Sequence, residues 1–71
     1  MQCKIMRPFR TFMHDFKKGQ VYEVKTDLHT PNTMIFTKRI FKSSTYPLAD
    51  IRCVFPNKET MNRHIRIINQ K

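Results

Sequence analysis

Most apolar residues of this chain lie in short runs that are rich in β-branched and aromatic side chains, and four prolines and a single glycine separate these runs. Runs of four to eight such residues are typical of β-strands. The clearest alternation of apolar and polar positions spans residues 50–55 and places Ile51, Cys53 and Phe55 on one side. We therefore predict a mainly β domain with a core strand at residues 50–55.

Other runs predict strands at residues 2–6 and 20–25. Cys3 and Ile5 share one face of the first, and Tyr22 and Val24 point inward from the second. Gly19 precedes the second strand and marks a turn, because glycine adopts backbone conformations that other residues avoid.

The longest β-favouring run covers residues 33–41. Regular alternation divides it into one face with Met34, Phe36, Lys38 and Ile40, and another with Ile35, Thr37, Arg39 and Phe41. Neither face is purely apolar, so we expect a bend or bulge near residues 37–39.

The remaining segments are predicted as connections. Residues 8–18 fit neither strand nor helix periodicity and indicate a long loop anchored by Phe9, Phe12 and Phe16. Residues 27–32 are rich in turn formers, and residues 42–47 predict another loop.

A short helical turn is expected at residues 59–64, with Asn57 or Thr60 as its cap. Residues 65–69 are favoured as a last strand, because three isoleucines within four residues suit a pleated surface. A continued helix is the alternative, since Met61, Ile65 and Ile68 recur at helical spacing.

Large side chains divide into an expected core and an expected surface set. A domain of 71 residues without Trp needs most of its large side chains inside. The expected core is Phe16, Tyr22, Phe36, Ile51, Cys53 and Phe55. Three loop aromatics are expected to be exposed for stacking or for an interface, namely Phe9, Phe12 and Tyr46.

Two stretches resemble a known family. Residues 16–24, Phe-Lys-Lys-Gly-Gln-Val-Tyr-Glu-Val, are similar to the opening of many Src-homology-three-like (SH3-like) modules, including small ones encoded by bacteriophages. The stretch from Val54 to Ile65 is similar to their closing strand, turn and strand. The resemblance implies a five-stranded SH3-like β-barrel with a short helical turn before the last strand.

The chain departs from the SH3 domains that bind proline-rich peptides. It contains no Trp, and basic residues stand where those domains carry an acidic loop. Polyproline recognition is therefore not expected. The basic residues at that loop are Arg10, His14, Lys17 and Lys18.

Charge is the strongest compositional signal. The chain has 14 Lys and Arg against 5 Asp and Glu, a net charge of +9 that is spread through every segment. Solubility alone is served by a smaller and more mixed charge, whereas this excess stores self-repulsion that an acidic partner relieves. A scattered, merely solvated surface is the plain alternative.

Catalytic and metal chemistry find little support. The carboxylates are scattered, and no Cys and His spacing typical of zinc sites is present. Cys3 and Cys53 are expected to be buried thiols of a single small domain at residues 1–71. We predict no enzyme activity, no cofactor and no metal.

No run approaches the apolar length of a membrane span, and the first residues lack the apolar stretch of a signal peptide. A cytoplasmic protein that does not bind membranes is therefore expected.

Two hypotheses about the partner follow. In the first, the chain binds nucleic acid through phosphates with little sequence preference. In the second, it is a small phage-like or mobile-element regulator that inhibits or redirects an acidic or nucleic-acid-processing host protein. A bias toward residues with AT-rich codons fits the second. The candidate binding residues are Arg10, Lys17, Lys18, Lys38, Arg39, Lys42, Arg52, Arg63 and Arg66. Because the third and fourth strands of an SH3-like barrel are neighbours, the resemblance implies that Arg39, Lys42 and Arg52 share a patch with whichever terminal arginine faces out.

Overall fold

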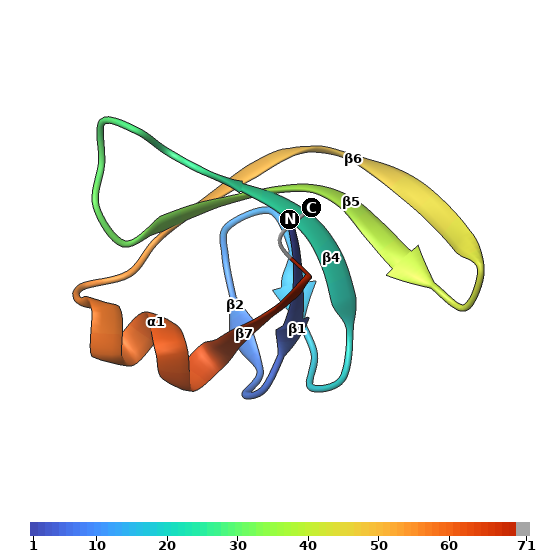
Figure 1. Ribbon diagram of the computed structural model, residues 1–71, viewed down its shortest axis with the longest axis horizontal. Helices are drawn as coiled ribbons and strands as arrows, with labels where there is room; N and C mark the ends of the chain where they lie inside the picture. The colour runs from blue at the N-terminus through green and yellow to red at the C-terminus, as the bar shows by residue number, and fades with distance from the viewer. Residues whose placement is uncertain (70–71) are drawn as a thin grey trace.

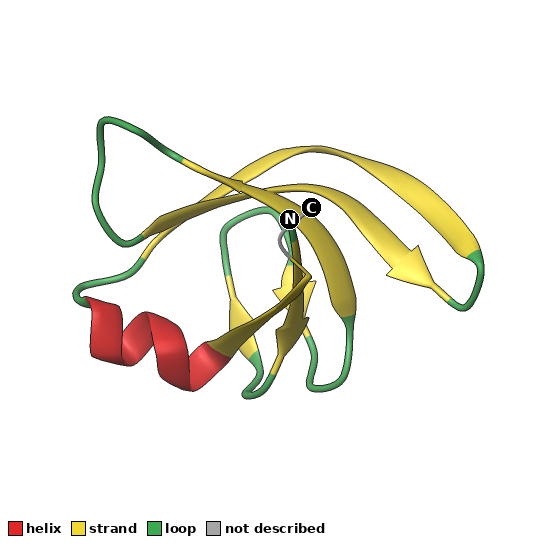
Figure 2. Ribbon diagram, in the orientation of Figure 1, coloured by secondary structure: helices red, strands yellow, loops and turns green. Residues whose placement is uncertain are grey.

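The computed structural model describes residues 1–69, which form seven strands and one short helix (Figures 1 and 2). The elements in chain order are β1 (Gln2–Ile5), β2 (Phe9–Arg10), β3 (Asp15–Phe16), β4 (Val21–Thr26), β5 (Thr33–Phe41), β6 (Ser44–Val54), α1 (Lys58–His64) and β7 (Ile65–Asn69).

Five strands form one antiparallel sheet in the order β6-β5-β4-β1-β7. The first strand, β1, therefore lies between β4 and β7. The sheet curves strongly, and β2 and β3 lie on the inside of this curve (Figure 1). The predicted mainly β class is confirmed. The strand at 65–69 is also confirmed, and the continued helix is excluded, because β7 pairs with β1 along its length.

The core lies between the sheet and the small β2–β3 hairpin. All six predicted core residues are buried, with Tyr22 and Phe36 fully inaccessible to solvent. Both cysteines are buried free thiols, as predicted. We call the sheet face that carries Cys3, Tyr22 and Phe36 the inner face.

The segment at residues 8–18 is a hairpin rather than the predicted loop. Phe9 pairs with Phe16 across β2 and β3, and their rings stack at 4.6 Å between centroids. Phe9 also makes an edge contact with Phe55 at 5.5 Å, so its predicted exposure is wrong and it is half-buried. Strands of two residues are too short to show a period-2 alternation in the sequence. Packing against the sheet stabilises this hairpin, which would be marginal on its own.

A bulge in β5 confirms the expected irregularity. Tyr22 lies opposite Arg39, whereas Val24 lies opposite Phe36, so β5 contains one extra residue, Thr37, relative to β4. The Thr37 hydroxyl donates a hydrogen bond to a backbone carbonyl of β4 at 3.2 Å. An extra residue reverses the face on which all following side chains lie.

This reversal corrects the predicted faces of β5. Arg39 and Phe41 lie on the inner face together with Phe36, and Lys38 and Ile40 lie on the outer face. The prediction grouped Lys38 and Ile40 with Phe36 because it followed an unbroken alternation along the strand.

The connection between β5 and β6 is also shorter than predicted. Phe41 pairs with Ser44, which leaves only Lys42 and Ser43 as the turn instead of a loop at residues 42–47. Lys42 has a left-handed φ of 57°. Pro47 lies within β6 because β6 is an edge strand, where a missing N–H need not interrupt the ladder.

The helix has the predicted cap. The Asn57 side chain accepts a hydrogen bond from the Thr60 N–H at 2.7 Å and thereby satisfies a donor of the first turn. Gly19 has a φ of 90°, as expected for its turn.

Nowhere in residues 1–69 is a helix both long and apolar enough to cross a bilayer.

Candidate functional site

Each of the five carboxylates is paired with a cation of the same molecule. The pairs are Arg10–Asp15 at 2.7 Å, Lys25–Asp50 at 3.7 Å, Arg52–Asp27 at 3.0 Å, Arg63–Glu59 at 2.5 Å, and the amino terminus with Glu23 at 2.8 Å. A hydrogen bond from the amino terminus lowers the pKa of Glu23. The pKa of Asp27 is lowered first by a hydrogen bond from the His29 N–H and further by Arg52.

The remaining basic side chains have no such partner. Within residues 1–69, nine Lys and Arg residues have no carboxylate oxygen within ion-pair distance. These residues are Lys4, Arg7, Lys17, Lys18, Lys38, Arg39, Lys42, Lys58 and Arg66. Lys38 differs from the other eight, because it lies opposite Glu23 and its charge helps to lower the pKa of that carboxylate.

One group of these charges lies beside aromatic rings at the end of the β5–β6 hairpin. There an open hollow of about 360 Å³ is lined by His14, Arg39, Phe41, Tyr46 and Leu48. Arg39 and Tyr46 are cross-strand partners, which places both side chains on the same face. We call this group the hairpin hollow.

Both rings of the hairpin hollow are half-exposed, at 49% for Phe41 and 51% for Tyr46. Two cations lie over the Phe41 ring, with Arg39 Cζ at 5.4 Å and Lys42 Nζ at 5.5 Å from its centroid. These distances permit cation–π attraction, which holds the two charges beside the ring.

Arg39 also carries an unused donor. Its Nε is buried and has no hydrogen-bond partner, the sole such side-chain atom in the part of the chain that the structure describes. A buried donor without an acceptor destabilises the protein by about 1–3 kcal/mol. Arg39 is thus a partly buried cation without an ion-pair partner that lines the hairpin hollow.

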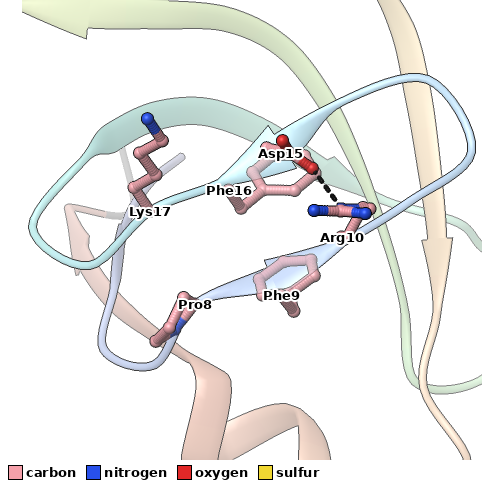
Figure 3. Close-up of a pocket in the computed structure, with 6 residues that line it drawn as sticks. All are labelled: Pro8, Phe9, Arg10, Asp15, Phe16 and Lys17. Carbon is pink, nitrogen blue, oxygen red and sulfur yellow. Dashed lines mark ion pairs between the residues drawn. The ribbon is translucent and has the colours of Figure 1, made fainter.

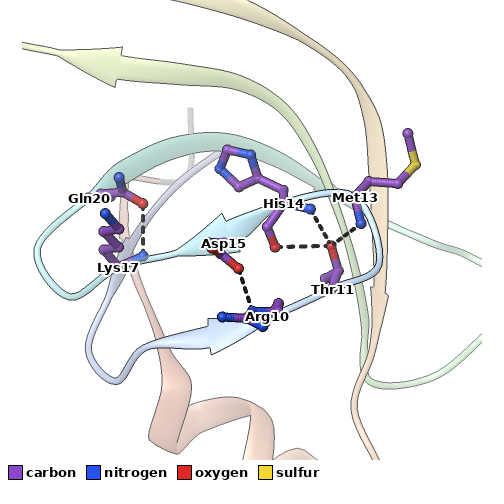
Figure 4. A network of polar contacts seen from close by, with 7 residues as sticks. All are labelled: Arg10, Thr11, Met13, His14, Asp15, Lys17 and Gln20. Carbon is purple, nitrogen blue, oxygen red and sulfur yellow. Dashed lines mark hydrogen bonds and ion pairs between the residues drawn. The ribbon is translucent and has the colours of Figure 1, made fainter.

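The β2–β3 hairpin positions His14 at the hairpin hollow (Figure 4). Thr11 Oγ1 accepts hydrogen bonds from the N–H groups of Met13 at 3.3 Å and His14 at 3.1 Å, which closes the hairpin loop. His14 Nε2 then lies 2.8 Å from the Tyr22 hydroxyl oxygen. That hydroxyl donates to Gln20 Oε1 at 2.7 Å, so its oxygen accepts from His14.

Burial raises the pKa of Tyr22, although the nearby Arg39 charge opposes this increase. The hydroxyl therefore stays protonated and keeps its place in the chain of hydrogen bonds that holds His14.

The structure gathers only part of the predicted site. Arg39, Lys42 and Tyr46 come together, whereas Arg52 does not join them. Arg52 lies opposite Ile35, seven residues along β5 from the turn at Lys42, or about 23 Å of extended strand. The predicted patch of Arg39, Lys42 and Arg52 is wrong, because antiparallel pairing carries residue 52 to the far end of the hairpin.

Arg10 and Lys17 lie at a second hollow of about 310 Å³, beside the stacked rings of Phe9 and Phe16 (Figure 3). The Arg10 guanidinium points at Asp15, so its charge is balanced locally. Lys18 belongs to the turn that follows.

Arg63 and Arg66 line a third hollow of about 530 Å³ between α1 and β7. Arg63 is paired with Glu59, and Arg66 lies opposite Lys4. Lys38 lies on the outer face opposite Glu23. Phe12 is fully exposed at the tip of the β2–β3 loop, as predicted for a surface aromatic, and it therefore does not anchor this segment as was also expected.

The two thiols are buried and line none of these hollows. Burial raises the pKa of Cys3 to about 12 and that of Cys53 to about 11, and their mutual repulsion adds to the value of Cys3. Among the described residues, no group of three or more His, Cys, Asp or Glu side chains is arranged to hold a metal ion.

The sequence prediction missed Phe41, His14 and Leu48 as members of the site. The signal for Phe41 was the absence of a purely apolar face in residues 33–41, which indicated a bulge without placing it. Comparison of the chain with family models, curated proteins and solved structures finds no match.

Proposed function

We propose that this protein is a non-enzymatic module that binds nucleic acid through the phosphate backbone with little sequence preference. The observation that carries the proposal is the charge balance within residues 1–69: each Asp and Glu side chain is paired with a cation, while nine Lys and Arg side chains have no carboxylate at ion-pair distance. A polymer of closely spaced negative charges matches unpaired cations that are spread over several elements.

The fold that we propose for this module is a small SH3-like barrel of the kind that bacteriophages encode. Three features support it: the strand order with β1 between β4 and β7, the long connection after β1, and the helical turn before β7. The strong curvature of the sheet is also compatible with a barrel (Figure 2).

A salt titration tests the binding proposal. Affinity for mixed-sequence DNA and RNA is measured by fluorescence anisotropy between 50 and 300 mM salt. Contact with about five phosphates gives a log–log slope of roughly −4 to −5. A dissociation constant weaker than about 10⁻⁴ M at physiological salt contradicts nucleic-acid binding. In that case the acidic surface of a host protein becomes the preferred partner.

Two variants with equal loss of charge sharpen this test. Lys42→Gln removes an unpaired cation, whereas Arg63→Gln removes one that Glu59 already balances. We expect Lys42→Gln to reduce the salt slope by about one and Arg63→Gln to change it less. Equal effects of both variants would show that only net charge matters.

A further inference from the structure

The hairpin hollow combines unpaired cations, which phosphate contacts use, with exposed aromatic rings, which phosphate contacts do not need. Phe41 and Tyr46 are half-exposed, and Arg39 and Lys42 have no carboxylate partner. A ligand that matches both properties carries a flat aromatic face and a negative charge close together.

Tyr46 is the surface on which such a flat group fits. Its neighbour Phe41 is already engaged by the charges of Arg39 and Lys42, which it holds in place. Tyr46 has no comparable contact among those resolved in residues 1–69, and half of its surface is open. The hollow between the two rings, about 360 Å³, lies within the range typical of small-molecule sites, so a nucleotide fits its scale.

From this arrangement we infer that the hairpin hollow binds single-stranded nucleic acid, with one base stacked on Tyr46 and its phosphate bound by Arg39 and Lys42. The inference rests on the proposed function and specifies its substrate class. A duplex covers both faces of every base by stacking within the helix, whereas a single strand leaves them free for protein rings.

His14 and Leu48 complete the hollow. Leu48 supplies an apolar wall on β6, and His14 closes the side toward the β2–β3 hairpin. The hydrogen bond from His14 to Tyr22 fixes the His14 ring, so the hollow is formed before a ligand arrives. A preformed site loses less conformational entropy on binding.

The test compares single-stranded oligo-dT and oligo-U with a duplex of the same length at one salt concentration. We expect both single strands to bind more tightly than the duplex. Because base faces and phosphates are common to DNA and RNA, binding of either single strand supports the inference, and the ratio of their affinities identifies the favoured polymer.

Variants of Tyr46 provide the sharper measurement. Stacking of a base on an aromatic ring contributes about 1–3 kcal/mol, so Tyr46→Ala should weaken single-strand binding by about 5- to 150-fold and leave duplex binding within about twofold. Tyr46→Phe keeps the ring and should retain single-strand affinity. Tyr46 is exposed on an edge strand, so these variants are expected to fold.

Phe12→Ala is the matched control, because it removes a fully exposed ring that does not line the hairpin hollow. An equal loss for Phe12→Ala and Tyr46→Ala overturns the inference. Equal binding of single strand and duplex, with no effect of Tyr46→Ala, also overturns the inference but leaves the proposed function intact. Absence of binding to either polymer refutes the proposed function itself.

Discussion

The buried thiols predict a loss of stability at alkaline pH. Cys3 is fully buried and Cys53 is 5% exposed. Burial raises the pKa of Cys3 from 9.0 to about 12 and that of Cys53 from 9.0 to about 11. Above pH 9 the unfolded chain therefore releases protons that the folded protein retains. The stabilisation that each protonated thiol provides is present below pH 9 and is lost as the pH rises toward its folded pKa.

The magnitude follows from these values. Between pH 8 and pH 10, each thiol lowers the free energy of unfolding by about 1 kcal/mol, because its ionisation is confined to the unfolded chain over this range. The two thiols together account for a loss of about 2–3 kcal/mol, a large part of the stability of a small domain. The raised pKa of Tyr22 adds to the loss from about pH 10 upward, where tyrosine in the unfolded chain ionises.

Urea denaturation at pH 8 and pH 10 in the presence of a non-thiol reductant measures this effect. Lysines also begin to titrate in this range, so the test compares the wild type with Cys53→Ala. The variant is expected to be less stable at both pH values because it leaves a small cavity. Its decrease between the two pH values should be smaller than that of the wild type by about 1 kcal/mol.

A decrease of the same size in Cys53→Ala and in the wild type would refute the reasoning for this thiol. Cys3→Ala is the independent repeat. Thiol labelling provides a second measurement, because alkylation of a buried, protonated thiol requires opening of the fold. Labelling of either cysteine in native protein at the rate seen in urea would contradict the burial on which the calculation depends.

Two further substitutions test the packing and the helix cap. Phe36→Ala removes a fully buried ring that contacts Phe9, Phe16 and Tyr22, and it should lower the free energy of unfolding by about 3–5 kcal/mol, measured by urea denaturation; a loss below 1 kcal/mol would contradict the central place of this ring. Asn57→Ala removes the side chain that caps α1 and should cost about 1 kcal/mol, with Asn57→Asp as the conservative control that keeps the cap.

Local pattern predicted much of the fold. The alternation at residues 50–55 identified Ile51, Cys53 and Phe55 as core because a strand buried on one face places every second side chain inside. The cap at Asn57 and the turn at Gly19 were predictable for a similar reason, since each depends on the chemistry of a few adjacent residues. The excess of positive charge was likewise fixed by composition.

The two-stranded hairpin at residues 8–18 was not predictable in this way. Its strands contain two residues each, and the stacking of Phe9 on Phe16 becomes favourable only when the rings also pack against Phe36 of the sheet. The predicted exposure of Phe9 was wrong for the same reason. Phe9 is half-buried by Phe16 and Phe55, which are not its neighbours in the sequence.

The sequence by itself therefore determined the β class, most strand positions, the core and the excess of positive charge. Only the tertiary structure decided which charges remain unpaired and where they meet aromatic rings. The single extra residue at Thr37 brings Arg39 and Phe41 to the inner face beside Tyr46. A bulge arises from the pairing of two strands, and its effect on later side chains depends on a register that no single strand encodes.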